Sequence, residues 1–123
     1  MACILFVDDD TLTLTLLGKA AQLLGHTPLT CTSGAEGLAL LTSARPDLVL
    51  VDLNLADMDG LEFIRQARSA PNGSCPPVIL HTAGRGPDDE QRAIEAGAQG
   101  CLPKPASLDA LADLIARYTT QPA

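Results

Sequence analysis

The chain has almost no aromatic residues: it contains no Trp, one Tyr and two Phe among 123 residues. This scarcity argues against functions that stack aromatic rings on bases or flavins. Basic residues are also few, with 8 Lys and Arg against 15 Asp and Glu, for a net charge of −7. A nucleic-acid-binding surface needs clustered basic residues. We therefore expect no nucleic-acid contact by this domain, and a core built mainly from aliphatic side chains.

The four cysteines, Cys3, Cys31, Cys75 and Cys101, form no C-x-x-C pair. This spacing disfavours a zinc site, and we expect small buried hydrophobic residues rather than disulfides. The apolar runs are only a few residues long, too short to cross a bilayer. No basic segment precedes an apolar stretch, as it would in a secretion signal. We expect a cytoplasmic protein without membrane association.

Short apolar runs alternate with helical patterns along a chain that has the length of one domain. Five strands are predicted at residues 2–7, 28–32, 47–51, 77–82 and 99–102. Helices are predicted at residues 12–24, 35–43, 60–69, 87–96 and from 108 onward. Because strands and helices alternate, right-handed crossovers give an α/β doubly wound fold. We expect a three-layer sandwich around a five-stranded parallel sheet, with the flavodoxin-like strand order 2-1-3-4-5.

Two of these helices have a predicted apolar face. In the first helix it consists of Leu12, Leu16, Leu17, Ala20, Leu23 and Leu24. In the last helix it consists of Leu108, Leu111, Ala112, Ile115 and Tyr118. Ser33 and Ser107 stand where the second and last helices need an N-cap.

Acidic residues gather in two short stretches, which contain Asp8, Asp9, Asp10, Asp52, Asp57 and Asp59. The first stretch follows the first strand, and Asp52 ends the third. These strands are neighbours at the point where strand order reverses, which is where ligands bind in such sheets. Converging carboxylates repel unless protonated or bridged by a cation, and oxygen ligands suit Mg²⁺. The alternative, that these acids cap helices, stays open, above all for Asp10.

Four motifs carry a family resemblance: ILFVDDD, DLVLVDLNLADMDG, VILHTA and KP, in this order and spacing. Together they resemble the receiver domain of two-component response regulators. The resemblance covers essentially the whole chain, with a receiver at 1–119 and a C-terminal tail at 120–123. It leaves open whether the chain is a complete regulator or a domain of a longer protein.

The resemblance implies a metal-dependent phosphoacceptor site. Asp8 and Asp9 match the acidic pair that holds Mg²⁺, for which Mn²⁺ can substitute. Asp52 matches the phosphoacceptor and a further metal ligand. The main-chain carbonyl of Asn54 matches the group that completes the metal site.

Other residues match groups that surround the phosphoryl group in the family. The main chains of Asn54 and Ala83 match its contacts, and Thr82 matches the switch hydroxyl. Lys104 matches the lysine that contacts the phosphate. The Lys104–Pro105 bond is expected to be cis, as is typical of the family.

The resemblance also implies partners. A histidine kinase or a histidine phosphotransfer protein would donate a phosphoryl group to Asp52. Thr82 would then move inward and bias a two-state equilibrium. A downstream protein or a fused output domain would read the surface of the fourth helix, fifth strand and fifth helix, and a phosphorylation-dependent dimer is compatible with this. Such a domain catalyses only its own phosphorylation and dephosphorylation, so we expect no enzyme with a separate turnover substrate.

The sequence departs from the family pattern at three positions. Cys101 stands at the switch position where the family usually has Phe or Tyr, so we expect a weaker or differently connected readout. Ala56 replaces a common Pro, which predicts a looser loop after Asp52. Ala106 replaces a common aromatic residue. His81 precedes Thr82 on a predicted strand, and we interpret it as structural.

The acidic residues are also compatible with three alternatives to a working receiver. A haloacid-dehalogenase-like phosphatase would use the D-x-D of Asp8–Asp10, but Leu12 stands where that pattern has Thr or Val. A flavin carrier is disfavoured because three aspartates would repel the phosphate of FMN. A degenerate receiver that docks partners without phosphorylation stays open, because Cys101 cannot act as a ring switch. Acyl-phosphate formation at Asp52 discriminates a working receiver from a degenerate one.

Overall fold

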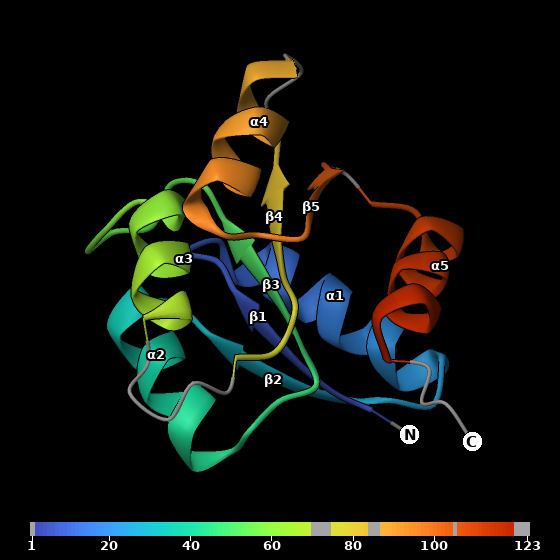
Figure 1. The fold of residues 1–123 in the computed structure, drawn as a ribbon. Coiled ribbons are helices and arrows are strands. Elements are labelled where there is room, and N and C mark those ends of the chain that lie inside the picture. Colours follow the sequence, from blue (N-terminus) through green and yellow to red (C-terminus); the bar gives the residue numbers. More distant parts are fainter. Residues whose placement is uncertain (1, 70–74, 84–86, 105, 120–123) are drawn as a thin grey trace.

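A computed structural model describes residues 2–69, 75–83, 87–104 and 106–119 (Figure 1). The elements in chain order are β1 (Cys3–Val7), α1 (Thr11–Leu23), β2 (Thr27–Cys31), α2 (Gly34–Ser43), β3 (Leu48–Asp52), α3 (Gly60–Arg68), β4 (Val78–Thr82), α4 (Pro87–Ala96), β5 (Gly100–Pro103) and α5 (Leu108–Thr119). The strands form one parallel sheet in the order β2-β1-β3-β4-β5. The predicted fold and strand order are confirmed, with element ends that shift by one residue at most.

Helices cover both faces of the sheet (Figure 1). Helices α1 and α5 pack on one face, where Phe6, Leu50 and Ile79 are buried. Helices α2, α3 and α4 pack on the other, over Val7, Val51 and Leu80. The successive residues of β1, β3 and β4 therefore face two cores, which explains their continuous apolar runs. All strands end at the same edge of the sheet, and the residues that follow them converge there.

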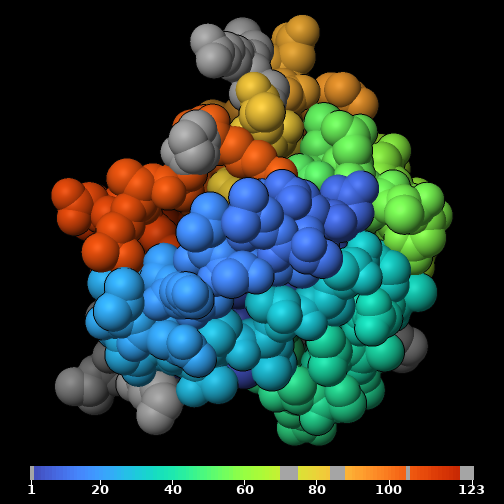
Figure 2. Space-filling model, turned by 180° about the vertical axis from the view of Figure 1, so that it is seen from behind, coloured from blue at the N-terminus to red at the C-terminus, as the bar shows by residue number. Residues whose placement is uncertain are grey.

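The apolar face predicted for α1 is partly wrong. Its buried residues are Leu14, Leu17 and Ala21. Leu12, Leu16 and Leu23 are instead 64%, 61% and 78% exposed. Both sets have helical spacing, so periodicity alone could not choose between them. Figure 2 shows this outer surface of α1, in blue, between α5 and the segments of β2 and α2.

The prediction for α5 needs a similar correction. Leu111 and Ile115 are buried as expected, but Leu108 is 46% exposed and Leu114 is buried in its place. Leu108 is the first residue of the helix. The Ser107 hydroxyl accepts a hydrogen bond from the Ala110 N–H at 3.0 Å, which confirms the predicted cap.

The edge strand β2 contains a proline. The backbone of β2 bonds β1 through the Thr27 N–H, which donates to Ala2, and through the Cys31 carbonyl, which accepts from Asp8. Successive residues of a strand direct their backbone groups to opposite sides, so the nitrogen of Pro28 faces away from β1. A proline at such an edge position removes no bond from the sheet.

All four cysteines are free, as expected. Cys31 is buried, and Cys3, Cys75 and Cys101 are half-buried. Among the described helices, none has the length and apolar character needed to cross a bilayer.

Candidate functional site

Three carboxylates meet where β1 and β3 end. Asp8 and Asp9 directly follow β1, and Asp52 is the last residue of β3. The two strands are paired, with Val7 opposite Val51. One oxygen from each of Asp8, Asp9 and Asp52 lies within 4.8 Å of the others. Asp8 and Asp52 are buried and Asp9 is exposed, so the cluster opens to solvent on one side.

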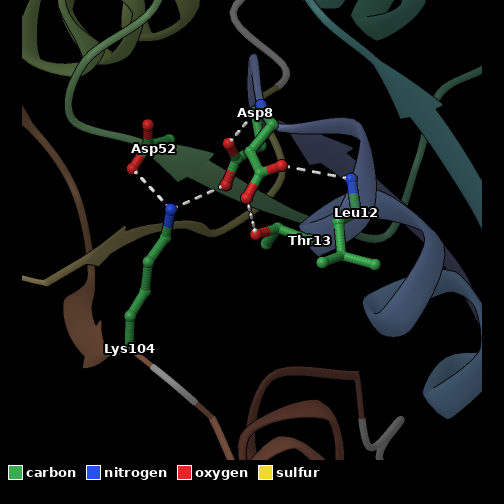
Figure 3. Close-up of polar contacts among 6 residues, drawn as sticks. Asp8, Leu12, Thr13, Asp52 and Lys104 are labelled. Atoms are coloured by element: carbon green, nitrogen blue, oxygen red, sulfur yellow. Dashed lines mark hydrogen bonds and ion pairs between the residues drawn. The ribbon is translucent and has the colours of Figure 1, made fainter.

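Lys104 directly follows β5, and its side chain extends to this cluster at the same edge of the sheet (Figure 3). Its Nζ lies 2.9 Å from Asp8 Oδ2 and 3.0 Å from Asp52 Oδ1. Its own N–H donates to the Thr82 carbonyl at 2.9 Å, which fixes the start of the side chain at the end of β4. Burial alone would lower the pKa of Lys104, but hydrogen bonds from the ammonium to Asp8 and Asp52 outweigh burial and raise the pKa. The ammonium therefore stays charged between the two carboxylates.

The cluster holds more negative than positive charge. Burial raises the pKa of Asp52, the charges of Asp8 and Asp9 raise it further, and the contact with Lys104 opposes both. One ammonium thus faces three carboxylates. Oxygen-only donors with surplus negative charge suit Mg²⁺, which binds through a few carboxylates and keeps several waters. The residues present therefore fit a magnesium ion.

Two other acidic residues of these stretches, Asp10 and Asp59, cap helices. Asp10 caps α1: its carboxylate accepts from the Leu12 N–H at 3.1 Å and from the Thr13 hydroxyl at 2.7 Å (Figure 3). Its own N–H donates to Asp8 Oδ1 at 2.9 Å, so the cap also orients Asp8. Asp59 caps α3 by accepting from the Glu62 N–H at 2.7 Å. The alternative interpretation as helix caps is confirmed for Asp10, and it holds for Asp59 too.

The remaining predicted residues lie around the same edge. Thr82 is buried at the end of β4. Ala83 is exposed just beyond it, and Asn54 is exposed two residues after Asp52. Pro105, and with it the expected cis bond, lies outside the described residues.

Cys101 and Ala106 are both half-buried. Burial raises the pKa of Cys101, and the charges of Glu90 and Asp89 raise it further, so this residue is a thiol near neutral pH. Ala106 packs against the core beneath α1 and α5.

His81 is a fourth buried polar residue near the cluster, besides Asp8, Asp52 and Thr82. It is 3% exposed. It lies two residues after Ile79 on β4, so both side chains are on the face covered by α1 and α5. Burial lowers its pKa to about 4, and the Lys104 charge contributes to this. Among the described residues, no group lies within hydrogen-bonding distance of its Nε2.

Sequence reasoning missed the contact made by Asp57. Its carboxylate accepts from the N–H groups of Gly34 and Ala35, at 2.9 and 3.0 Å. Gly34 and Ala35 are 23 and 22 positions from Asp57 in the chain, so no local sequence pattern predicts the contact. Ala56 does leave this loop without a proline, but Asp57 anchors the loop at the next position.

The comparisons with known proteins agree with this geometry. Residues 4–116 match the model of the response regulator receiver domain. The chain is 36% identical over 115 residues to the sensor histidine kinase RcsC of Salmonella typhi, covering 94% of this chain and 12% of that protein. It is 38% identical over 114 residues to the transcriptional regulatory protein GlrR of Escherichia coli, covering 93% of this chain and 25% of that protein.

A solved structure is similar over nearly its whole length. The chemotaxis protein CheY4 of Vibrio cholerae matches with a TM-score of 0.89 and 30% identity, covering 96% of this chain and 98% of that one. The curated relatives are much longer, since this chain spans only about an eighth and a quarter of the two named above. The chain belongs to the response regulator receiver domain family of two-component signalling.

Proposed function

We propose that this chain is a phosphoacceptor receiver, in which Asp52 takes a phosphoryl group from a phosphohistidine of a histidine kinase or a histidine phosphotransfer protein. The observation that carries the proposal is the Lys104 ammonium, which touches both Asp8 and Asp52 inside a cluster of three carboxylates. A lysine that follows β5 and contacts two buried carboxylates at the ends of β1 and β3 can stabilise a negatively charged group bound there. Folding alone does not require such a contact.

Mg²⁺, or Mn²⁺ in its place, would be held by Asp8, Asp9, Asp52 and the main-chain carbonyl of Asn54. A bound divalent cation neutralises the charge that the phosphoryl group brings to the carboxylates. The three carboxylates supply the oxygen ligands and the negative charge that such an ion needs.

In the transfer, a carboxylate oxygen of Asp52 attacks the phosphorus of the phosphohistidine. A phosphorus–oxygen bond forms, the phosphorus–nitrogen bond breaks, and the electron pair leaves with the imidazole. The Lys104 Nζ is 3.0 Å from Asp52 Oδ1, so it is within reach of an oxygen of the new phosphoryl group. Positioning and charge stabilisation supply most of the catalysis in such a transfer.

The acyl phosphate would then change the state of the domain. The Thr82 hydroxyl and the N–H groups of Asn54 and Ala83 would contact the phosphoryl oxygens, drawing the end of β4 toward Asp52. A partner protein or a fused output domain would read the surface of α4, β5 and α5, and a phosphorylation-dependent dimer is one form of this. Cys101 puts a small thiol where a ring would report this movement. We place this activity in the cytoplasm, within residues 1–119, with no separate turnover substrate.

Incubation with acetyl phosphate and Mg²⁺, followed by intact mass, tests the proposal. We expect one phosphoryl group on the wild-type protein, none after Asp52→Asn, and none in EDTA. Asp109→Asn is the matched control, because Asp109 is an exposed aspartate in the first turn of α5, and it should be phosphorylated like the wild type. No adduct, or an adduct indifferent to Asp52, would refute the phosphoacceptor and favour a receiver that docks partners without phosphorylation.

A further inference from the structure

The loop between β3 and α3, residues 53–59, is folded back on itself. Asn54 and Asp59 form an antiparallel bridge across it. The Leu55 N–H donates to the Met58 carbonyl at 3.2 Å, and the Gly60 N–H donates to the Leu53 carbonyl at 2.6 Å. Asn54 thus lies in a tight hairpin, with Asp57 and Met58 at its far end.

Asp57 ties this far end to the start of α2. The first four N–H groups of a helix have no partner within it. Here Asp57 accepts from the first two, those of Gly34 and Ala35, through its two carboxylate oxygens. The Ser33 hydroxyl accepts from the third, that of Glu36, at 3.2 Å, and the next N–H, that of Gly37, makes the first helical bond to the Ser33 carbonyl. The three donors of the first turn are therefore satisfied, two of them by a residue from another loop.

Packing supports the same contact. A Cβ added to Gly34 would lie 2.6 Å from the sulfur of Met58, so Met58 occupies the space that a side chain would need there. At the near end of the loop, a Cβ added to Gly60 would overlap the Asp52 carbonyl oxygen. The hairpin that carries Asn54 is therefore held closely at both of its ends.

We propose that Asp57 is a positioning residue for the metal site: by clamping the 53–59 hairpin to the start of α2, it sets where the Asn54 carbonyl stands and thereby sets the affinity for Mg²⁺. The inference rests on the proposed function, because it takes that carbonyl as a ligand. Asp57 itself acts from outside the site. Its two oxygens face α2, and the carboxylates that converge among the described residues are those of Asp8, Asp9 and Asp52.

Electrostatics agrees with this role. The N–H groups of Gly34 and Ala35 hold the pKa of Asp57 below its ordinary value. The carboxylate is therefore ionised near neutral pH, and it also lies at the positive end of the α2 dipole. An amide at this position keeps one acceptor but sets a donor against a donor, so Asp57→Asn should retain only part of the clamp.

The test compares Asp57→Ala and Asp57→Asn with Ser33→Ala. Ser33→Ala removes a cap from the same helix without touching the hairpin, so it separates the stability of α2 from the position of the loop. Backbone amide shifts followed against MgCl₂ concentration give the affinity of each protein for Mg²⁺. Hydrogen exchange of the Leu55 and Gly60 amides, measured in EDTA, reports on the hairpin without any metal.

We expect Asp57→Ala to weaken Mg²⁺ binding roughly tenfold, as loss of an outer-shell partner typically does. Its Leu55 and Gly60 amides should exchange faster, and Asp57→Asn should be intermediate in both respects. Ser33→Ala should lower the unfolding temperature but leave the affinity and both amides unchanged.

Three results would overturn the inference. One is an unchanged affinity in Asp57→Ala, and another is an equal loss in Ser33→Ala. In both cases the wild-type protein still binds Mg²⁺, so the proposed function stands. The third is a wild-type protein whose amides do not respond to MgCl₂, which removes the metal site and the inference together.

Discussion

His81 should make the protein sensitive to mild acid. The imidazole is buried beside the charged cluster, with Lys104 and Asp8 as the charged groups that act on it, and its Nε2 has no partner among the described residues. Replacing it with leucine removes both a titratable group and an unsatisfied polar atom while nearly conserving volume. A buried polar atom without a partner costs about 1–3 kcal/mol. At pH 7 we therefore expect His81→Leu to be neutral or stabilising.

The larger effect appears as the pH falls. The pKa of His81 is about 4 in the folded protein and 6.5 in an unstructured chain. Above pH 6.5 both states are neutral at this residue and it contributes no pH dependence. Between 6.5 and 4 the unfolded state takes up a proton that the folded state refuses, so the free energy of unfolding falls by about 1.4 kcal/mol per pH unit. At pH 4.5 the loss relative to pH 7 is about 2.5 kcal/mol.

Urea unfolding followed by far-UV circular dichroism, in EDTA at several pH values between 7 and 4.5, measures this loss. Carboxylates also titrate in this range, so the informative quantity is the difference between the wild type and His81→Leu. That difference should grow by about 2.5 kcal/mol in favour of the variant on going from pH 7 to 4.5. A difference that does not change with pH would refute the reasoning.

Three further predictions concern the cluster and its surroundings. Gly60→Ala forces a Cβ against the Asp52 carbonyl and should lower the free energy of unfolding by about 3 kcal/mol. In Gly18→Ala the new Cβ meets only Pro28 at 3.9 Å, so this variant should raise the free energy of unfolding by about 0.5–1 kcal/mol. Urea titration compares the two. Lys104→Met leaves Asp8 and Asp52 without their ammonium and should lower the free energy of unfolding by about 2 kcal/mol in EDTA; a loss below about 0.5 kcal/mol would mean that the ion pairs contribute little. Burial raises the pKa of Asp52, so its charge opposes folding. Asp52→Asn should therefore unfold at higher urea than the wild type in EDTA, and saturating MgCl₂ should remove that difference. A lower urea midpoint for the variant in EDTA would contradict this.

The fold was predictable because its signals are local. Each strand is a short apolar run, and breakers such as Gly25 or the caps Ser33 and Ser107 mark helix ends within one residue. The buried side of α1 was not predictable, because leucines occur on two of its faces and only the sheet decides which face is covered. Helical periodicity places a stripe on a helix, but neighbouring elements determine whether it is buried.

The candidate site also has a part that the sequence predicts and a part that it does not. Motif spacing singled out Asp8, Asp9 and Asp52, which the structure brings together. The family resemblance assigned Lys104 to the phosphoryl group, but its ion pair with Asp8, which joins residues 96 positions apart, was not predicted. Neither a local pattern nor a motif predicts the contact of Asp57 with α2. Its carboxylate oxygens accept from backbone N–H groups, which every residue except proline has.

Pro28 has a consequence for how the protein behaves at high concentration. An exposed strand edge is a template on which a second chain can add its own strand, the first step toward aggregation. With Pro28 at the second position of the five-residue strand β2, the outward side of this edge lacks one N–H donor. The opposite edge, β5, is only four residues long and ends in Pro103. Neither border of the sheet offers a long, regular row of donors, so copies of the chain meeting in solution find little backbone to pair with.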